Sequence, residues 1–302
     1  MKLLKRLFVI SLFLLPLHFA PLAHPTTLNA PKVVKQGEVY IVGISIEEAG
    51  GGDISSVRGI FCKRRVYFNR TPYPGTYSGL MGVDVSEEAV KKLLRVVIKR
   101  VDGTVELADK EITIEEVDFG VQRISVPKKW VDYDSETEER ISLESKKIKE
   151  VLGAETKERL WDAPFVRPTE GRISTTFGLM RYINGKPKSP HCGIDIVAYL
   201  GTPVLSANRG RVALVIDAFI PGLTVILDHG QGLYSTYCHL SKVLVSEGEE
   251  VDRGQGIALV GGTGRITGVH LHYGITVNSN RVDPLAVEKI DVDENGSIYI
   301  SR

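Results

Sequence analysis

Apolar and polar residues alternate with a period of two over much of the first third of the chain. The clearest run is residues 40–46, in which every second side chain is apolar. This period places those side chains on one face of a β-strand. Further β-rich runs at residues 93–101 and 104–114 flank Asp102-Gly103, a dipeptide typical of hairpin turns. Several short strands at such spacing predict a small β-sandwich over residues 27–117.

The pattern changes between residues 118 and 168, which we interpret as a linker. Residues 134–160 are rich in charge and carry apolar residues at helical spacing: Ile141, Leu143, Ile148, Val151 and Leu152. This spacing predicts an amphipathic, largely solvated helix that connects two halves of the chain. From Gly171 onward, short strands and Gly turns return and no further helix is predicted. The predicted fold class is mainly β, with an N-terminal β-sandwich, a helical connector and a C-terminal antiparallel β-sheet domain over residues 169–290.

The first residues predict export. Residues 1–6 carry three basic side chains, and residues 7–23 form an apolar run that ends in small residues, which is the layout of a secretory signal peptide over residues 1–23. Cleavage is expected between Ala20 and His24. A retained membrane anchor is the alternative, but the run is shorter than the roughly 20 apolar residues that span a bilayer, and Pro16 and His18 interrupt it. We therefore expect an exported protein, periplasmic or associated with the cell wall, with no stable membrane span after signal removal.

Charge narrows the function classes. The net charge of the 302 residues is +1, and the sequence has no run rich in Lys and Arg with interleaved aromatic residues. Nucleic-acid binding therefore gains no support from the sequence.

Histidines are concentrated in the last part of the chain. The predicted β-sandwich has none, whereas five of the seven fall in residues 191–302: His191, His229, His239, His270 and His272. In His270-Leu271-His272 the two imidazoles would project from the same face of a strand. Clustering of His with an Asp is typical of metal sites, so this region is the candidate metal site.

The spacing of His191 and Asp195 requires a local explanation. Four residues span about 13 Å along an ideal strand, whereas two ligands of one zinc ion lie within about 4 Å of each other. Either the backbone bends at Gly193, or the His side chain reaches from the loop before the strand. His229, which precedes a glycine, is interpreted as a structural turn residue and not as a ligand.

Five motifs, in this order and spacing, closely resemble the lysostaphin-type (LytM-like) metallopeptidase family. They are His191-Cys-Gly-Ile-Asp195, Gly201-Thr-Pro-Val204, Tyr237-Cys-His239-Leu240, Gly261-Gly-Thr-Gly264 and His270-Leu-His272, and the resemblance covers about residues 171–285. The upstream β-domain resembles, more weakly, the immunoglobulin-like domain of one branch of this family. Many members have an aromatic residue and a Glu where this chain has Tyr273-Gly274, and the Gly form is found in that same branch.

The resemblance implies a role for each of the five site residues. His191, Asp195 and His272 would bind one zinc ion, and His239 and His270 would stand beside it as catalytic residues. Three protein ligands leave an open position for water or substrate. Zinc would lower the pKa of that water toward about 7 and polarise the scissile carbonyl. One of the two other His would move a proton, and the other would stabilise the developing oxyanion. The sequence has no His-Glu-x-x-His motif, which excludes the thermolysin arrangement.

Together with export, the resemblance implies a zinc metalloendopeptidase that acts on the stem peptides of bacterial peptidoglycan. We expect cleavage of the D,D cross-link and not of a glycine bridge, because no wall-targeting module is recognisable. One alternative is a catalytically silent peptidoglycan-binding activator of a cell-wall amidase, which retention of all three ligands disfavours. A second is a structural periplasmic adaptor whose β-domain binds a partner.

The three cysteines form an odd set for an oxidising compartment, so at least one is free or paired between chains: Cys62, Cys192 and Cys238. Cys192 and Cys238 each adjoin a predicted site His. Alternation along a strand would turn both sulfurs away from the metal, where they could form a disulfide. The alternative is that both are small buried residues that fill space. A thiolate ligand is disfavoured, since zinc already has three better-matched partners.

Overall fold

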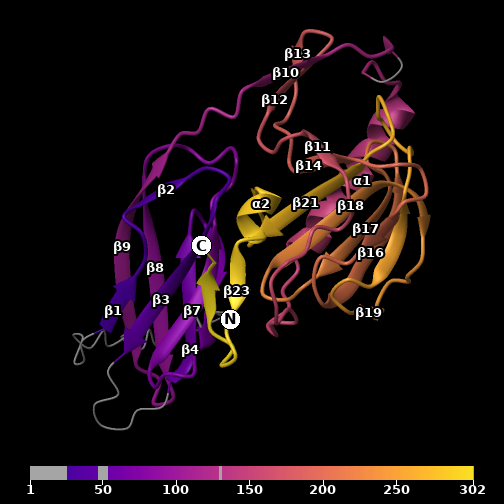
Figure 1. Cartoon of the computed structure of the whole chain (residues 1–302). Coiled ribbons are helices and arrows are strands. Elements are labelled where there is room, and N and C mark those ends of the chain that lie inside the picture. The colour runs from indigo at the N-terminus through magenta and orange to yellow at the C-terminus, as the bar shows by residue number, and fades with distance from the viewer. Residues whose placement is uncertain (1–25, 47–53, 129–130, 302) are drawn as a thin grey trace, which may run out of the picture.

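The computed structural model describes residues 26–46, 54–128 and 131–301, so the predicted signal peptide lies outside the described residues. The prediction of a mainly β protein is confirmed, because strands dominate these ranges and only two helices occur in them. Figure 1 shows two lobes, joined by a long connecting segment and by C-terminal elements, in yellow, that lie between them. Neither described helix is long and apolar enough to cross a membrane.

The N-terminal lobe contains two β-sheets. The first has the order β1-β3-β7-β6 and is formed by Thr26–Asn29, Val39–Ile46, Thr76–Gly82 and Asn69–Arg70. The second has the order β2-β9-β8-β4-β5 and is formed by Val33–Lys35, Val105–Glu115, Lys91–Arg100, Ile54–Phe61 and Arg64–Tyr67. Aliphatic side chains from both sheets, among them Val42, Ile44 and Ile98, share one buried core. The assignment of this lobe as immunoglobulin-like stays a prediction.

Local sequence signals explain the strands of this lobe. In β3, Val42, Ile44 and Ile46 are buried, as their alternation requires. The predicted hairpin is formed by β8 and β9, but its turn differs from the expected two-residue type. Only Gly103 adopts a positive φ, of 90°, and the backbone N–H of Arg100 donates to the carbonyl of Thr104 at 2.9 Å. The loop therefore holds three residues, with glycine in the left-handed position.

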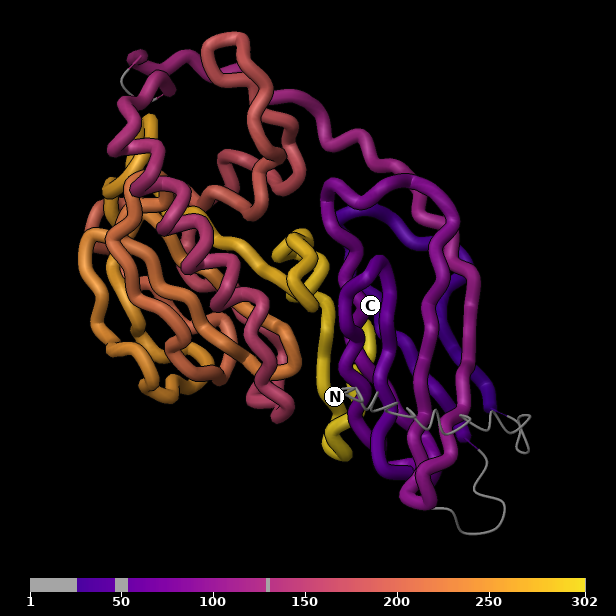
Figure 2. The backbone as a smooth tube through the Cα atoms, turned by 180° about the vertical axis from the view of Figure 1, so that it is seen from behind, coloured from indigo at the N-terminus to yellow at the C-terminus, as the bar shows by residue number. Residues whose placement is uncertain are grey.

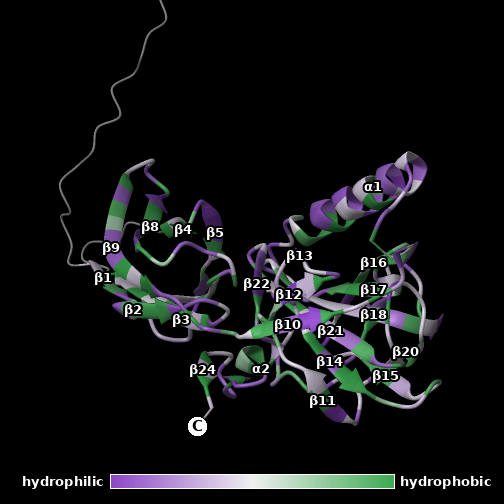
Figure 3. Ribbon diagram, turned by 90° about the horizontal axis from the view of Figure 1, so that it is seen from above, coloured by the Kyte–Doolittle hydropathy of each residue, from purple (hydrophilic) through white to green (hydrophobic). Residues whose placement is uncertain are grey.

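The connecting helix α1 spans Ser135–Leu152, within the segment predicted to be helical. Asp134 caps its N-terminus by accepting a hydrogen bond from the backbone N–H of Thr137 at 2.8 Å. No residue of α1 is buried, and the helix is largely hydrophilic in Figure 3. Its Ile148, Val151 and Leu152 pack on a small cluster of Leu214, Ile226 and Tyr234. Leu143 was expected on that apolar face but is 61% exposed, so the apolar stripe is confined to the C-terminal turns.

The C-terminal lobe is built on one large antiparallel sheet. Its main path has the order β11-β14-β21-β18-β17-β16-β19, formed by Arg172–Thr175, Ile194–Val197, Leu271–Val277, Leu233–Val243, Gly222–Asp228, Gly210–Ala218 and Glu250–Val251. Three further strands join it: β15 (Pro203–Leu205), β20 (Gly256–Val260) and β22 (Asn280–Val282). In Figure 2, α1 lies across this lobe.

A three-stranded sheet stands beside the large sheet. It consists of β10 (Val121–Ile124), β12 (Met180–Ile183) and β13 (Lys186–Pro187). β10 comes from the predicted linker and pairs in parallel with β12, with Gln122 opposite Arg181. The linker therefore does more than connect the lobes, because its first part is a strand of the C-terminal lobe.

Two elements near the C-terminus depart from the sequence prediction. No helix was expected after Gly171, but α2 spans Pro284–Val287, with Asp283 as its N-cap and a proline in its first turn. A helix of one turn is too short to show a period, which is why the pattern missed it. The predicted C-terminal domain ends at residue 290, but β23 (Ile290–Val292) and β24 (Ile298–Ile300) extend it as a hairpin. Ile290 and Ile298 of this hairpin pack on the core of the C-terminal lobe.

The two lobes share an extensive interface. Asp84 of the N-terminal lobe pairs with Arg281 of β22, with Oδ1 2.6 Å from Nη2 and Oδ2 3.0 Å from Nε. Val39 and Val85, also from the N-terminal lobe, belong to the same buried core as Val277 and Val282. The lobes therefore share apolar core as well as a partly buried ion pair.

Candidate functional site

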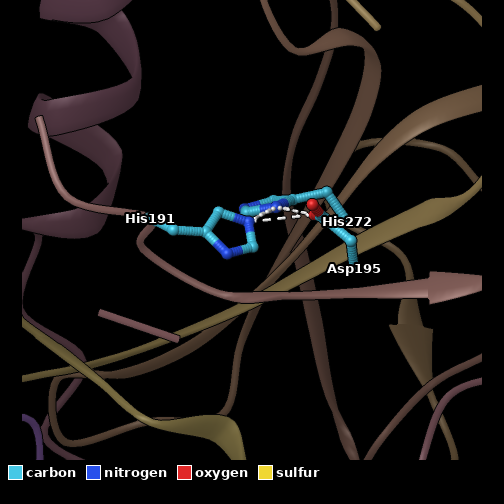
Figure 4. Close-up of side chains that lie close together, drawn as sticks. All are labelled: His191, Asp195 and His272. Atoms are coloured by element: carbon cyan, nitrogen blue, oxygen red, sulfur yellow. Dashed lines mark hydrogen bonds and ion pairs between the residues drawn. The ribbon is translucent and has the colours of Figure 1, made fainter. Parts of the chain in front are cut away.

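Three of the predicted site residues converge at the edge of the large sheet. His191 lies in the loop before β14, Asp195 lies in β14, and His272 lies in the adjacent strand β21, directly opposite Asp195. His191 Nε2 is 2.9 Å from Asp195 Oδ1 and 3.0 Å from His272 Nδ1. His272 Nδ1 is also 2.9 Å from Asp195 Oδ1. Figure 4 shows the three side chains pointing at one another from these separate segments.

The loop before β14 resolves the spacing problem of His191 and Asp195. β14 begins only at Ile194, so His191 reaches the site from the loop, which is one of the two arrangements expected. Glycine is needed at position 193 because two backbone segments pack closely there, and not because the backbone is left-handed. A Cβ at this position would lie 2.3 Å from the carbonyl oxygen of Tyr273 and 2.9 Å from Cε1 of His272. Only glycine therefore lets the loop pass against β21.

Outer contacts fix which ring nitrogen faces the centre. His191 Nδ1 lies 2.8 Å from the carbonyl oxygen of Thr176. A carbonyl oxygen only accepts, so Nδ1 carries the proton and Nε2 is a bare lone pair. His272 presents its other nitrogen, Nδ1, to the centre, and its Nε2 lies 3.9 Å from Cys192 Sγ. The two imidazoles are thus oriented as metal-ligating imidazoles are.

His239 and His270 lie beside this group. Their ring centroids are 4.9 Å apart, and the ring of His239 is 6.2 Å from that of His272. His239 Nδ1 donates to the carbonyl oxygen of Thr263 at 2.9 Å, and His270 Nδ1 donates to that of Gly268 at 2.8 Å. In its neutral form each ring keeps an unprotonated Nε2. His270 Nε2 is 3.6 Å from Asp195 Oδ1.

The backbone around His239 is unusual. His239 adopts a φ of 63° inside β18, a left-handed conformation that is rare outside glycine and frequent at functional sites. The pairing register of β18 shifts next to it, and such bulges re-aim side chains. The Gly261–Gly264 motif braces this position, because the Thr263 hydroxyl donates to the carbonyl of Leu240 at 2.8 Å while its own carbonyl holds His239.

Burial and mutual charge set the protonation of the site. Burial lowers the pKa of His191 and lowers that of His239 to about 3, where His272 and His270 act in the same direction. Against its burial, the contacts of Oδ1 with the His191 and His272 imidazoles hold the pKa of Asp195 well below its usual range. Conversely, Asp195 raises the pKa of His272 against the effect of burial. The carboxylate is therefore ionised.

The three converging atoms fit a metal ion. Two imidazole nitrogens and a carboxylate oxygen lie within 4.8 Å of one another, and their separations of 2.9 to 3.0 Å approach the roughly 3.3 Å between ligands of a tetrahedral zinc ion. His191 and Asp195 are 2% and 5% exposed, so water cannot solvate the carboxylate freely. A metal cation satisfies these lone pairs and charges together.

An open groove of about 520 Å³ runs past these residues. Asp195, His239 and His270 line it, together with residues of the linker and of edge strand β11, including Gln122, Ile124, Ser174 and Thr175. Three of the five predicted site residues thus lie in the wall of an open groove.

His229 and the three cysteines are not among the converging ligands, although Cys192 Sγ contacts His272 Nε2. Cys192 is exposed, so the alternative of two small buried residues holds only for Cys238. His229 is fully buried, with Nδ1 2.8 Å from the carbonyl of Arg209 and Nε2 2.7 Å from Ser235 Oγ. Cys62, Cys192 and Cys238 are all free thiols, so the disulfide alternative is not formed. Burial raises the pKa of Cys238 to about 12, which makes it an inert space-filling residue.

Two polar side chains near the centre were not anticipated from the sequence. Arg181 Nη2 is 3.0 Å from Asp195 Oδ2, and Gln122 contacts Arg181 in turn. Neither residue belongs to a recognisable motif. Only the pairing of β10 with β12 brings Gln122 to this place, and single-sequence patterns do not report such pairing.

Comparison with known proteins accords with this geometry. Residues 189–284 match Peptidase family M23, so the chain carries a peptidase domain of that family, which agrees with the predicted resemblance. The chain is 40% identical over 115 residues to the peptidoglycan DD-endopeptidase ShyA of Vibrio cholerae, and 37% identical over 116 residues to the DD-carboxypeptidase/endopeptidase Mpg of Neisseria meningitidis. Each match covers 38% of this chain and only 27% of the relative.

One solved structure matches most of the chain. A Pseudomonas aeruginosa protein solved as a candidate peptidase M23 aligns with a TM-score of 0.61 and 25% identity, covering 86% of this chain and 96% of that chain. The likeness therefore extends beyond the peptidase domain into the N-terminal half.

Proposed function

We propose, on the premise of the M23 peptidase domain, that this protein is an exported zinc metalloendopeptidase that hydrolyses peptide cross-links of bacterial peptidoglycan. His191, Asp195 and His272 would bind one zinc ion, and His239 and His270 would be the catalytic residues. The observation that carries the proposal is the convergence of His191 Nε2, Asp195 Oδ1 and His272 Nδ1 beside two further imidazoles with bare Nε2 atoms.

The donor set supports zinc. Two imidazole nitrogens and one carboxylate oxygen are a set used by catalytic zinc sites, which keep a fourth position open. A structural site would instead supply four protein ligands. Among the described residues, the cluster of potential metal ligands contains three: His191, Asp195 and His272.

The chain's own residues would then move the proton. When bound, zinc supplies Lewis acidity, which polarises the scissile carbonyl and makes water a stronger nucleophile. In their neutral forms, His239 and His270 each keep an unprotonated Nε2 beside the centre, because their Nδ1–H groups are committed to backbone carbonyls. His270 would accept the proton of the attacking water, because burial and neighbouring imidazoles lower the pKa of His239 to about 3 and make it a weak base. Once protonated, the same Nε2 becomes a donor for the oxyanion or for the leaving amine.

The relatives support the substrate class. Two of the relatives, ShyA and Mpg, are named as peptidoglycan DD-endopeptidase and as DD-carboxypeptidase/endopeptidase. We therefore propose the D,D cross-link between stem peptides as the bond that is cut, in preference to a glycine bridge. An apolar run with the layout of a signal peptide precedes the described residues and supports an exported protein.

The non-catalytic alternative finds less support. A silent activator of an amidase would not need two oriented imidazoles beside an intact set of metal ligands. Each of the five side chains is held in place by a specific contact. A module that only binds peptidoglycan would not require this arrangement of buried polar groups.

Digestion of purified cross-linked muropeptide dimers tests the proposal. We expect the zinc-loaded protein to convert dimers into monomers with the mass of a hydrolysed D,D bond, chelation to stop the reaction, and added zinc to restore it. If the zinc-loaded protein binds peptidoglycan but leaves the dimers intact, the result would contradict the proposed endopeptidase activity and favour the role of amidase activator.

A further inference from the structure

The linker strand β10 forms part of the groove that holds the candidate site. Gln122 and Ile124 of β10, and residues 125–127 that follow it, line the groove together with residues of β11. This segment precedes the match to the peptidase family, which begins at residue 189. The wall on this side of the centre is therefore supplied by chain outside the matched domain.

A chain of two hydrogen bonds runs from this wall to the metal-binding group. Gln122 Oε1 accepts from Arg181 Nε at 2.9 Å, and Arg181 Nη2 donates to Asp195 Oδ2 at 3.0 Å. Gln122 and Arg181 are direct neighbours across the parallel pair β10 and β12. Gln122 thus holds the guanidinium at Nε, and Arg181 holds the carboxylate through Nη2.

The two oxygens of Asp195 have different partners. Oδ1 faces His191 and His272 at 2.9 Å each, whereas Oδ2 is held by Arg181. A carboxylate whose outer oxygen is held in this way offers only one oxygen to a metal ion. If Oδ2 were free, the group could rotate and bind with both oxygens, which would crowd the position needed for water.

We propose that Arg181 is a positioning residue that keeps Asp195 in single-oxygen coordination, and that Gln122 of the linker strand orients Arg181. The inference rests on the proposed function, because it takes Asp195 as a metal ligand. It assigns to the linker a part in the metal centre, although the sequence pattern suggested a solvated connector.

Two effects of Arg181 on metal binding oppose each other. Its hydrogen bond orients the carboxylate, which favours binding, while its positive charge reduces the attraction of Asp195 for a cation. The Arg181 side chain is 26% exposed, so solvent screens its charge more than it weakens a direct hydrogen bond. Loss of the outer partner of a metal ligand typically weakens metal affinity about 10-fold to 100-fold. Orientation is therefore expected to dominate.

Metal affinity and cobalt spectroscopy of the full chain test the proposal without measuring activity. Zinc affinity would be measured by competition with a chelator for the wild type and for Arg181→Ala, Arg181→Lys, Gln122→Ala and Gln122→Glu. Arg211→Ala is the matched control, since Arg211 pairs with Glu250 on the exposed surface of β16 and β19. Cobalt(II) in place of zinc reports the coordination number through the intensity of its visible absorption.

We expect Arg181→Ala to bind zinc about 10-fold to 100-fold more weakly, with a weaker cobalt absorption that indicates an added ligand oxygen. Arg181→Lys should behave similarly, because Arg181 contacts Gln122 and Asp195 through two nitrogens of a rigid fork, whereas Lys offers one nitrogen on a flexible stem. Gln122→Ala should shift both readouts in the same direction by less. Gln122→Glu keeps an acceptor and should resemble the wild type, as should Arg211→Ala.

Unchanged affinity and spectrum in both Arg181 variants would overturn the inference, and so would tighter zinc binding, which would mean that charge outweighs orientation. Wild-type behaviour of Arg181→Lys alone would also overturn it, because the charge would then suffice. These results are distinct from failure of the proposed function, in which the wild type itself binds no zinc.

Discussion

Both lobes bury apolar side chains in their cores, but they differ in the polar side chains that they bury. Within the described part of the N-terminal lobe, the buried polar or charged residues are Asp84, Arg100 and Glu106. Arg100 pairs with Glu106, and Asp84 pairs with Arg281 of the other lobe. The other fourteen of the seventeen buried polar residues in the structure lie in the C-terminal lobe, so the lobe with the candidate site is the one that carries polar groups inside.

The difference teaches how to separate structural from functional polar groups. Burial of a polar group is costly unless it is hydrogen-bonded. His229 meets this requirement within the protein, because each ring nitrogen has its own partner. At the candidate site, by contrast, His191, Asp195 and His272 aim three potential metal ligands at one another. Convergence of acceptors, and not burial itself, therefore marks the site.

The largest expected effect comes from removing a converging acceptor. Asp195→Ala or His191→Ala should reduce hydrolysis of cross-linked muropeptides to background, because two remaining ligands are too few to hold the ion. His229→Gln is the matched control, since it changes a buried His that already has two partners. His229→Gln should keep near wild-type activity at neutral pH. Equal losses of activity in the ligand variants and in His229→Gln would contradict the distinction between converging ligands and a buried structural His.

The next effect separates the ligands from their neighbours. His239→Ala and His270→Ala should lower the hydrolysis rate by about 10²-fold or more while zinc content stays at the wild-type level, since each removes an imidazole that moves a proton or stabilises the oxyanion. Rate measurements paired with metal analysis check this. Loss of zinc from His239→Ala would show that the roles of ligand and catalyst are exchanged.

A third effect concerns the contact between the lobes. Asp84→Ala leaves Arg281 without its carboxylate partner in a largely buried contact and should lower the free energy of unfolding by about 2–4 kcal/mol. Asp109→Ala breaks the exposed pair with Arg95 and should cost at most about 1 kcal/mol. Chemical denaturation measures both. Two separate unfolding transitions in the wild type would contradict a shared core.

The smallest effect is a pH dependence that comes from His229. Burial lowers its pKa from 6.5 to about 4, so between these values the unfolded chain binds a proton that the folded chain does not. Stability should therefore fall as pH drops from about 6.5 to 4, by up to about 3 kcal/mol from this group. In His229→Gln the fall should be smaller by that amount. Parallel profiles of stability against pH for the wild type and His229→Gln would exclude a buried neutral His229.

Several features of the fold were predictable because they are local. Alternation located β3 and the hairpin of β8 and β9. Helical spacing located the start of α1 next to its capping Asp134, but the helix ends at Leu152 and not near residue 160. The five candidate site residues could be named because their motifs are short and specific. The strand expected for His270-Leu271-His272 begins only at Leu271, so His270 lies just before β21. The geometry of His191, which reaches from a loop, was one of two arrangements that the spacing allowed.

The missing features depend on contacts between distant segments. Gln122 and Asp195 are joined only through Arg181 and the pairing of β10 with β12, which no local pattern encodes. The contact between the lobes, such as Asp84 with Arg281, is equally non-local. Deletion of residues 27–117 would remove Val39 and Val85 from the shared core. Such a deletion is therefore a poor test of the peptidase domain alone.

Metal content of the purified protein tests the central claim most directly. Elemental analysis of the zinc-exposed, dialysed wild type should give about one zinc ion per chain, and Asp195→Ala treated identically should give almost none. A wild type without zinc, or an Asp195→Ala variant that retains one zinc ion per chain, would contradict the assignment of His191, Asp195 and His272 as the metal-binding group.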